Sequence, residues 1–140
     1  MNKRPSWLNE KTIILPNGEE AVWSYDAEGD FLEIFFHDSP ASATVELAEG
    51  IFLRLDRERQ QPLSIGFIAA SHRLQQQEFG YPLLKLSGLD KVSPADRQMI
   101  LNMLQRPPLN AILQLYSFKP SPRTQTIPVA VFNQPIPLPA

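Results

Sequence analysis

The sequence predicts an α+β fold: an antiparallel β-meander over about residues 11–71, one amphipathic helix over about residues 94–105, and an extended, proline-rich C-terminal segment. Three observations support this prediction. Short apolar runs are separated by turn residues, the apolar period lengthens to that of a helix after residue 93, and 6 of the 14 prolines fall within residues 119–140. Proline disrupts both helices and central strands, so the last segment is expected to be extended.

A turn signal marks the first hairpin of the predicted sheet. Asn17 and Gly18 stand between the apolar runs 12–15 and 21–25. Both residue types tolerate the positive φ angles that a tight turn requires. The two runs are therefore expected to pair as antiparallel strands.

Four further strands are expected before residue 71. Their runs cover residues 31–36, 44–47, 51–56 and 62–70. Alternation is clearest in the third run, where Arg54 and Asp56 separate apolar residues that point the other way. Gly66 lies inside the last run, which indicates a β-bulge or a close approach of the backbone at that position.

A helix is expected to begin at Ser93. This serine suits the N-cap, Pro94 suits the first helical position, and Asp96 lies near the positive end of the helix dipole. One apolar stripe follows at helical spacing, formed by Met99, Ile100, Met103 and Leu104. The helix should end near Gln105, because prolines follow at positions 107 and 108.

Two strands are expected after the helix, over residues 111–118 and 127–132. The second is expected at a sheet edge, because Pro128 has no backbone N–H to donate to a central ladder. We therefore assign residues 1–118 to a single α+β domain and residues 119–140 to a proline-rich C-terminal arm.

Composition and charge exclude several classes of protein. The chain has no cysteine, which rules out disulfides, thiolate zinc sites and iron–sulfur clusters. No apolar run approaches the roughly 20 residues of a membrane span, and the N-terminus lacks the apolar stretch of a signal peptide, so a cytoplasmic protein is expected. Residues 1–96 carry 15 acidic and 9 basic side chains, whereas residues 97–140 carry 4 basic side chains and no acid. This split is too gentle for a nucleic-acid-binding patch, and we expect no nucleic acid, membrane, metal or cofactor to be bound.

Three motifs stand out over residues 25–71. They are Tyr25-Asp26-x-x-x-Asp30-x-Leu32-x-Ile34, Glu46-Leu47-x-x-Gly50-Ile51-x-Leu53-x-Leu55-Asp56 and Ile65-Gly66-Phe67-Ile68-x-Ala70-Ser71. The motifs resemble those of a small bacterial family, the domain-of-unknown-function family numbered twenty-two eighty-three, and the resemblance implies a compact β-rich unit without an established activity. The chain departs from the family pattern at Glu33, where an aromatic residue is usual, and at Arg59-Gln60, where the turn normally contains glycine. The second departure suggests a longer or looser hairpin tip.

Alternating acids open the polar stretch before the third strand. Asp26, Glu28 and Asp30 have the spacing of the first ligands in a calcium-binding loop. Such a loop needs glycine at its sixth place and glutamate at its twelfth, but these places hold Phe31 and His37. Turn chemistry, in which the aspartates cap backbone N–H groups, is therefore favoured over metal binding.

Two pairs that contain histidine resemble parts of catalytic sites. His37-Asp38 has the types for acid–base work, but neighbouring residues on a strand point to opposite faces. Ser71-His72 combines a nucleophile with a base, but no G-x-S-x-G turn surrounds it, and a surface loop is favoured. No catalytic residue is assigned.

The C-terminal region is too apolar for a disordered linker, which is typically polar and highly charged. Its apolar side chains need cover, either from the chain's own sheet or from a second subunit that exchanges this arm. The predicted interface residues are Phe118, Ile127, Val129, Val131 and Phe132.

Two functions are compatible with this sequence. The first is a non-enzymatic interaction or structural module that assembles as a homo-oligomer, in the simplest case a homodimer, or that binds another protein. The alternative is a small enzyme or ligand-binding domain with a carboxylate-lined cleft near Asp26, Asp30 and His37.

Overall fold

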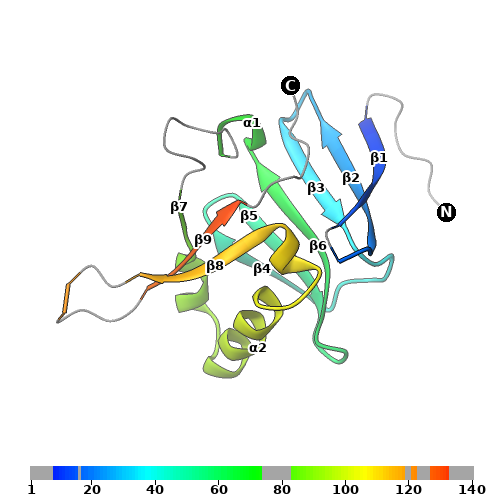
Figure 1. Ribbon diagram of the computed structural model, residues 1–140. Helices are drawn as coiled ribbons and strands as arrows, with labels where there is room; N and C mark the ends of the chain where they lie inside the picture. Colours follow the sequence, from blue (N-terminus) through cyan, green and yellow to red (C-terminus); the bar gives the residue numbers. More distant parts are fainter. Residues whose placement is uncertain (1–7, 16, 74–82, 119–120, 123–126, 133–140) are drawn as a thin grey trace.

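A computed structural model describes residues 8–15, 17–73, 83–118, 121–122 and 127–132 of the chain (Figure 1). These residues form two antiparallel sheets and a few short helices, so the predicted α+β fold is confirmed. Most of the C-terminal arm lies outside the described residues. No helix in the described ranges is long and apolar enough to cross a membrane.

The larger sheet has six strands in the order β1-β2-β3-β6-β5-β4. The strands are β1 (Leu8–Ile14), β2 (Glu20–Asp26), β3 (Phe31–Phe35), β4 (Ala43–Ala48), β5 (Ile51–Asp56) and β6 (Gln61–Ile68). All neighbours are antiparallel, which confirms the predicted meander. It consists of two consecutive three-stranded meanders, joined because β6 returns to pair with β3.

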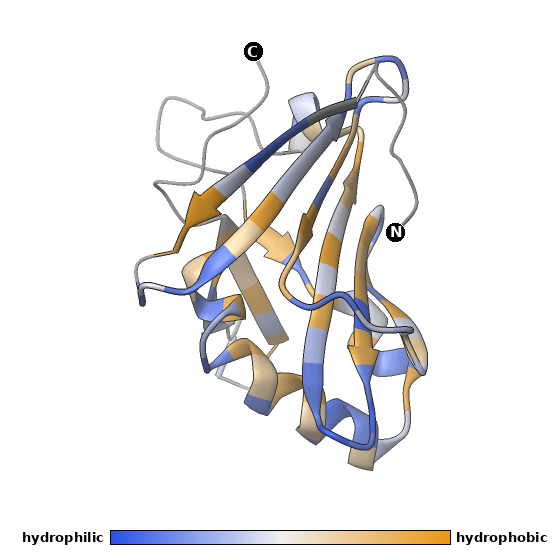
Figure 2. Cartoon of the chain, turned by 90° about the vertical axis from the view of Figure 1, so that its right-hand side faces the viewer, coloured by the Kyte–Doolittle hydropathy of each residue, from blue (hydrophilic) through white to orange (hydrophobic). Residues whose placement is uncertain are grey.

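Alternation of residue types explains which faces of these strands are buried. In β5, Ile51, Leu53 and Leu55 are fully buried, while the residues between them are half-buried. Figure 2 shows hydrophobic and hydrophilic residues alternating along the strands. The period of two in the sequence therefore directs one face of the sheet towards the core.

The glycines of the sheet show two different requirements. Gly18 has a φ of 89° in the turn between β1 and β2, and its N–H donates to Leu15 O, which confirms the predicted hairpin. Of the two alternatives predicted at Gly66, the close approach is confirmed and the bulge is not, because the register is regular there and the bulges lie elsewhere. A Cβ at Gly66 would lie 2.9 Å from Cζ of Phe31, so glycine makes room for an aromatic side chain.

Helices follow the larger sheet, and the longest is the predicted one. They are α1 (Ala70–Arg73), the 3-10 helix η1 (Ser87–Lys91), α2 (Pro94–Leu104) and the 3-10 helix η2 (Leu109–Ala111). The Ser93 hydroxyl oxygen accepts a hydrogen bond from Asp96 N at 3.1 Å, so the predicted N-cap is confirmed. Ile100, Met103 and Leu104 are buried in the core.

The smaller sheet contains β7 (Leu83–Lys85), β9 (Ile127–Phe132) and β8 (Leu113–Phe118), in that order. The central strand is therefore β9, and the prediction that it lies at an edge is wrong. Leu86 N donates to Pro128 O at 3.1 Å, so the backbone polar atoms of Pro128 face the β7 side. The ladder between β7 and β9 ends at Lys85 and Val129, so the missing N–H of Pro128 falls just beyond that ladder.

One edge of the larger sheet is covered by η1. Gly88 packs so closely on β4 that an added Cβ would collide with the backbone of Glu46 and Leu47. Protection of this edge depends on the absence of a side chain at position 88.

Candidate functional site

Antiparallel pairing sorts the turns of the larger sheet between its two ends. The β2–β3 turn and the start of α1 lie at one end, and we call this the clasp end. The β1–β2 turn, the residues after β3 and the β5–β6 turn lie at the other end, which we call the pocket end.

At the clasp end, the carboxylate of Asp30 joins three groups. The Tyr25 hydroxyl donates to Oδ1 at 2.7 Å, Ser71 N donates to Oδ1 at 3.0 Å, and the Ser71 hydroxyl donates to Oδ2 at 2.6 Å. Ala70 N also donates to Asp30 O at 2.9 Å. Asp30 thereby ties the β2–β3 turn to the chain that leaves β6.

The neighbouring turn has the chemistry predicted for its aspartates. Asp26 Oδ1 accepts a hydrogen bond from Gly29 N at 3.1 Å, and Asp30 adopts a φ of 51°. Aspartate tolerates this left-handed conformation better than most residues. The predicted capping within the turn is confirmed for Asp26, whereas the Asp30 carboxylate accepts from Ser71 N, 41 residues away in the sequence. In the described part of the chain, no group of three or more His, Cys, Asp or Glu residues is arranged to hold a metal ion.

Electrostatics indicate that this cluster stabilises structure. Burial acts to raise the pKa of Asp30, but hydrogen bonds from Ser71 and Tyr25, together with nearby His72, outweigh it, so the pKa lies below its ordinary value. The hydrogen bond to Asp30, burial and nearby carboxylates raise the pKa of the Tyr25 hydroxyl. A carboxylate with a lowered pKa is a weak base, so Asp30 is poorly suited to activate Ser71 as a nucleophile.

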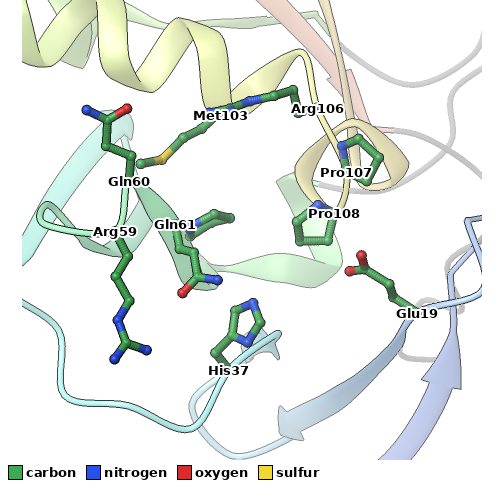
Figure 3. Close-up of a pocket in the computed structure, with 10 residues that line it drawn as sticks. Glu19, His37, Arg59, Gln60, Gln61, Met103, Arg106, Pro107 and Pro108 are labelled. Atoms are coloured by element: carbon green, nitrogen blue, oxygen red, sulfur yellow. The ribbon is translucent and has the colours of Figure 1, made fainter.

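His37 lies at the pocket end, because β3 separates it from Asp30. The structure therefore brings Asp26 and Asp30 together but not His37, and this corrects the predicted three-residue cleft. His37 instead lines a cavity of about 360 Å³ (Figure 3). The other lining residues are Glu19, Arg59, Gln60, Gln61, Pro62, Met103, Arg106, Pro107 and Pro108.

The smaller sheet carries the predicted interface residues. The backbone register pairs Val131 with Leu83 and Val129 with Tyr116, and it places Ile127 on the same face of the sheet. We call this the outer face, and it also holds the exposed polar residues Lys85 and Gln114.

The apolar residues of the outer face differ in exposure. Leu83 and Tyr116 are 63% and 47% exposed, Ile127 and Val131 are half-buried, and Val129 is buried. The sequence interpretation missed Tyr116, although its place in the predicted strand 111–118 is a usable signal. It also missed Leu83, whose segment has no clear period.

Two predicted interface residues are known only by backbone position. Phe118 pairs with Ile127, and Phe132 pairs with Leu113. Their side chains are not among those that the structure describes.

Comparison with known proteins finds a family resemblance for one segment of the chain. Residues 23–71 match the family described as "Protein of unknown function (DUF2283)". The resemblance predicted over residues 25–71 is therefore confirmed for this segment. The DUF2283 segment runs from β2 to Ser71, so it contains Asp30 and all three groups that donate to its carboxylate. No curated protein and no solved structure matches the chain.

Proposed function

We propose that this protein is a non-enzymatic interaction module that forms a homodimer through the outer face of the smaller sheet. The observation that carries the proposal is the apolar strip on this face, formed by Leu83, Tyr116, Ile127, Val129 and Val131. Large exposed apolar residues that gather on one face are typical of interaction surfaces.

A second copy of the chain suits this face. A two-fold contact places the same strip against itself, so apolar residues meet apolar residues. Lys85 is the only charged residue among the described residues of the face. The β8–β9 hairpin projects from the body in Figure 1, and Leu83 and Tyr116 are exposed on the outer face of the smaller sheet. Tyr116 offers a large surface of the kind enriched in interfaces.

The clasp end gives little support to the alternative of a carboxylate-lined catalytic cleft. The Asp30 carboxylate already accepts three hydrogen bonds from Tyr25 and Ser71, and His37 lies at the opposite end of β3. The DUF2283 family is itself described as one of unknown function, so it names no activity that competes with the proposal.

Light scattering on the full chain and two variants tests the dimer. Tyr116→Lys places a charge in the strip, whereas Ile14→Lys changes an apolar residue on β1 that is also exposed, 65% against 47% for Tyr116, and serves as the control. We expect wild type and Ile14→Lys to have twice the chain mass and Tyr116→Lys to have the mass of one chain. A monomeric wild type would contradict the proposal, as would dissociation caused by Ile14→Lys alone.

Point substitutions are preferable to removing the residues after Ser117. Such a truncation deletes β9, the central strand of the smaller sheet, and with it the fully buried Ala130. A loss of dimer in the shortened chain would therefore report damage to the core as readily as loss of an interface.

A further inference from the structure

The larger sheet carries apolar residues on both faces. One face packs against α2 and the smaller sheet, because Ile65, Ile100 and Ala130 belong to one buried core. The alternate strand residues point to the opposite face, which we call the phenylalanine face, and its apolar members are Val22, Phe31, Phe35, Phe52 and Ile68. Ile68 is 45% exposed and the other four are half-buried. The second face of an antiparallel sheet is commonly polar and solvated, so an aromatic one indicates an interaction surface.

The middle of the phenylalanine face is low and apolar. Gly66 pairs with Phe52, and a Cβ at Gly66 would lie 2.9 Å from Phe31 Cζ. The Phe31 ring therefore lies close to the backbone of β6 instead of standing away from the sheet. Ser64, the next residue of β6 on this face, has a small side chain and is fully buried. The side chains of a partner can thus pack along β6 between the aromatic residues of β3 and β5.

The polar residues in this part of the face are already paired. The Ser64 hydroxyl donates to Glu33 Oε2 at 2.7 Å, and Arg54 Nη1 lies 3.6 Å from the same oxygen. Covering a polar group that is hydrogen-bonded within the protein costs less than covering an unpaired one. An apolar partner surface can therefore lie over Glu33 without leaving its carboxylate unsatisfied.

Acidic residues flank the phenylalanine face on two sides. By strand alternation, Glu20 and Asp26 lie at this face on β2, and Glu46 lies at it on β4. Among the strand residues that the structure describes on this face, Arg54 is the only base, and it is paired with Glu33. A partner with positive charge on both sides of an apolar centre complements this arrangement.

We propose that the phenylalanine face binds an amphipathic helix of another protein, in which lysine or arginine residues border an apolar stripe. Phe31 and Phe35 are separated by about 13 Å along β3, which corresponds to about two and a half turns of an α-helix. The strands from β2 to β5 span about 14 Å, close to the diameter of about 12 Å of a helix with its side chains. A helix laid along β6 covers the aromatic residues and has acidic residues of β2 on one side and Glu46 on the other. This surface is separate from the outer face of the smaller sheet, so the inference does not depend on the homodimer.

Titration of the ¹⁵N-labelled full chain with a synthetic helical peptide of about 18 residues tests this proposal by NMR. The peptide has leucines on one face and lysines on both sides of them, and a control peptide has glutamate in place of every lysine. We expect backbone shifts at Val22, Glu33 and Phe52 and none at Tyr116, with about tenfold weaker binding of the glutamate peptide. Absence of shifts on the phenylalanine face, or equal binding of the two peptides, would overturn the proposal.

Two apolar substitutions test the contact surface. Phe52→Ser and Ile68→Ser should each weaken binding of the lysine peptide about tenfold, because each removes an apolar side chain from the interface. Ile68 is already 45% exposed, so Ile68→Ser keeps the test valid if Phe52→Ser disturbs the sheet. Leu83→Ser, at an exposed position of the smaller sheet, is the control and should leave the affinity unchanged. Wild-type affinity in Ile68→Ser would contradict the proposal.

A charge substitution tests the acidic border. Glu20→Lys should weaken binding of the lysine peptide about threefold, the size expected for an exposed charge pair. Glu58→Lys makes the same change at an exposed position of the β5–β6 turn and should have no effect. Equal losses in the two variants would show that the peptide senses only the net charge of the protein, which would contradict the assigned border.

Two other occupants of the face give different results. If Ile68→Ser reduces the mass measured by light scattering from two chains to one, the face binds a second copy. If the lysine peptide binds only after Ile136→Lys and Leu138→Lys, the face is occupied by residues 133–140 of the same chain. Either result would overturn the assignment to another protein.

Discussion

The clasp end and the pocket end belong to the same sheet but treat their charged groups in opposite ways. At the clasp end, the Asp30 carboxylate accepts hydrogen bonds from Tyr25 and Ser71 and holds two segments together. At the pocket end, Glu19 and His37 line a cavity without a hydrogen bond or ion pair to another described side chain. A polar group that is hydrogen-bonded within the protein contributes to stability, whereas Glu19 and His37 are exposed to solvent and contribute little. Substitutions at the two ends should therefore differ in their effect on stability.

The largest difference is expected for removal of an aspartate from each end. Asp30→Ala deletes three hydrogen bonds and leaves the partly buried hydroxyl of Tyr25 without its acceptor, so the free energy of unfolding should fall by about 3 kcal/mol. Asp38→Ala, at an exposed position beyond β3, should change it by less than about 0.5 kcal/mol. Urea denaturation measures both. Equal losses in the two variants would remove the distinction between the ends.

A smaller loss is expected when a single clasp bond is removed. Tyr25→Phe keeps the buried ring and deletes only the hydroxyl that donates to Asp30 at 2.7 Å. Asp30 keeps its two hydrogen bonds from Ser71, so the free energy of unfolding should fall by about 1.5 kcal/mol, typical of a hydrogen bond to a charged group. In Asp30→Ala the same tyrosine substitution should cost much less, because its acceptor is already gone. Additive losses would show that the two residues act independently.

Each end of the sheet contains a non-glycine residue with a left-handed backbone conformation. Replacing either residue by glycine should stabilise the protein. Ala69 has a φ of 55° at the clasp end and Gln60 a φ of 52° in the β5–β6 turn. Relief of this conformation outweighs the greater chain entropy of glycine, so Ala69→Gly and Gln60→Gly should each raise the free energy of unfolding by about 0.5 kcal/mol. Thermal denaturation with Ala27→Gly as control measures the effect. A lower melting temperature for either variant would contradict this prediction.

The smallest expected effect is on acid sensitivity. The pKa of Asp30 is lowered in the folded protein, so the unfolded chain binds a proton more readily. The contribution of Asp30 to stability is therefore present above the ordinary pKa of aspartate and is lost as the pH falls through the lowered folded value. Stability measured against pH in acid should fall less steeply for Asp30→Asn than for wild type. An equally steep fall in Asp30→Asn would show that the dependence does not come from Asp30.

Much of the local structure was predictable, because neighbouring residues determine it. Asn17-Gly18 signals the first hairpin, and Ser93-Pro94 signals the start of α2. The glycine missing from the β5–β6 turn has a local consequence too, since Gln60 adopts the positive φ that glycine would favour. The sequence predicted a longer or looser turn here. In the structure the turn is held by Asp56 Oδ1, which accepts hydrogen bonds from the N–H groups of residues 58 and 59.

Long-range pairing was harder to predict than the elements themselves. Pro128 suggests an edge strand, because proline has no N–H to donate. However, the β7–β9 ladder ends just before Pro128, so β9 can lie in the centre of the sheet. The segment that supplies β7 has no clear apolar period, so the sequence did not predict a strand there. Without β7, the central position of β9 could not be predicted.

By itself, the sequence determined the α+β class, the strands other than β7, the helix α2, the turn residues and the resemblance over residues 25–71, because period, caps and turns are local properties. Only the tertiary structure decided that Asp30 meets Ser71 while His37 lies at the opposite end of the sheet. These positions depend on which strands pair, and β6 pairs with β3 across a gap of more than 25 residues. The burial of a whole core decides such pairings, and no short stretch of sequence contains that information.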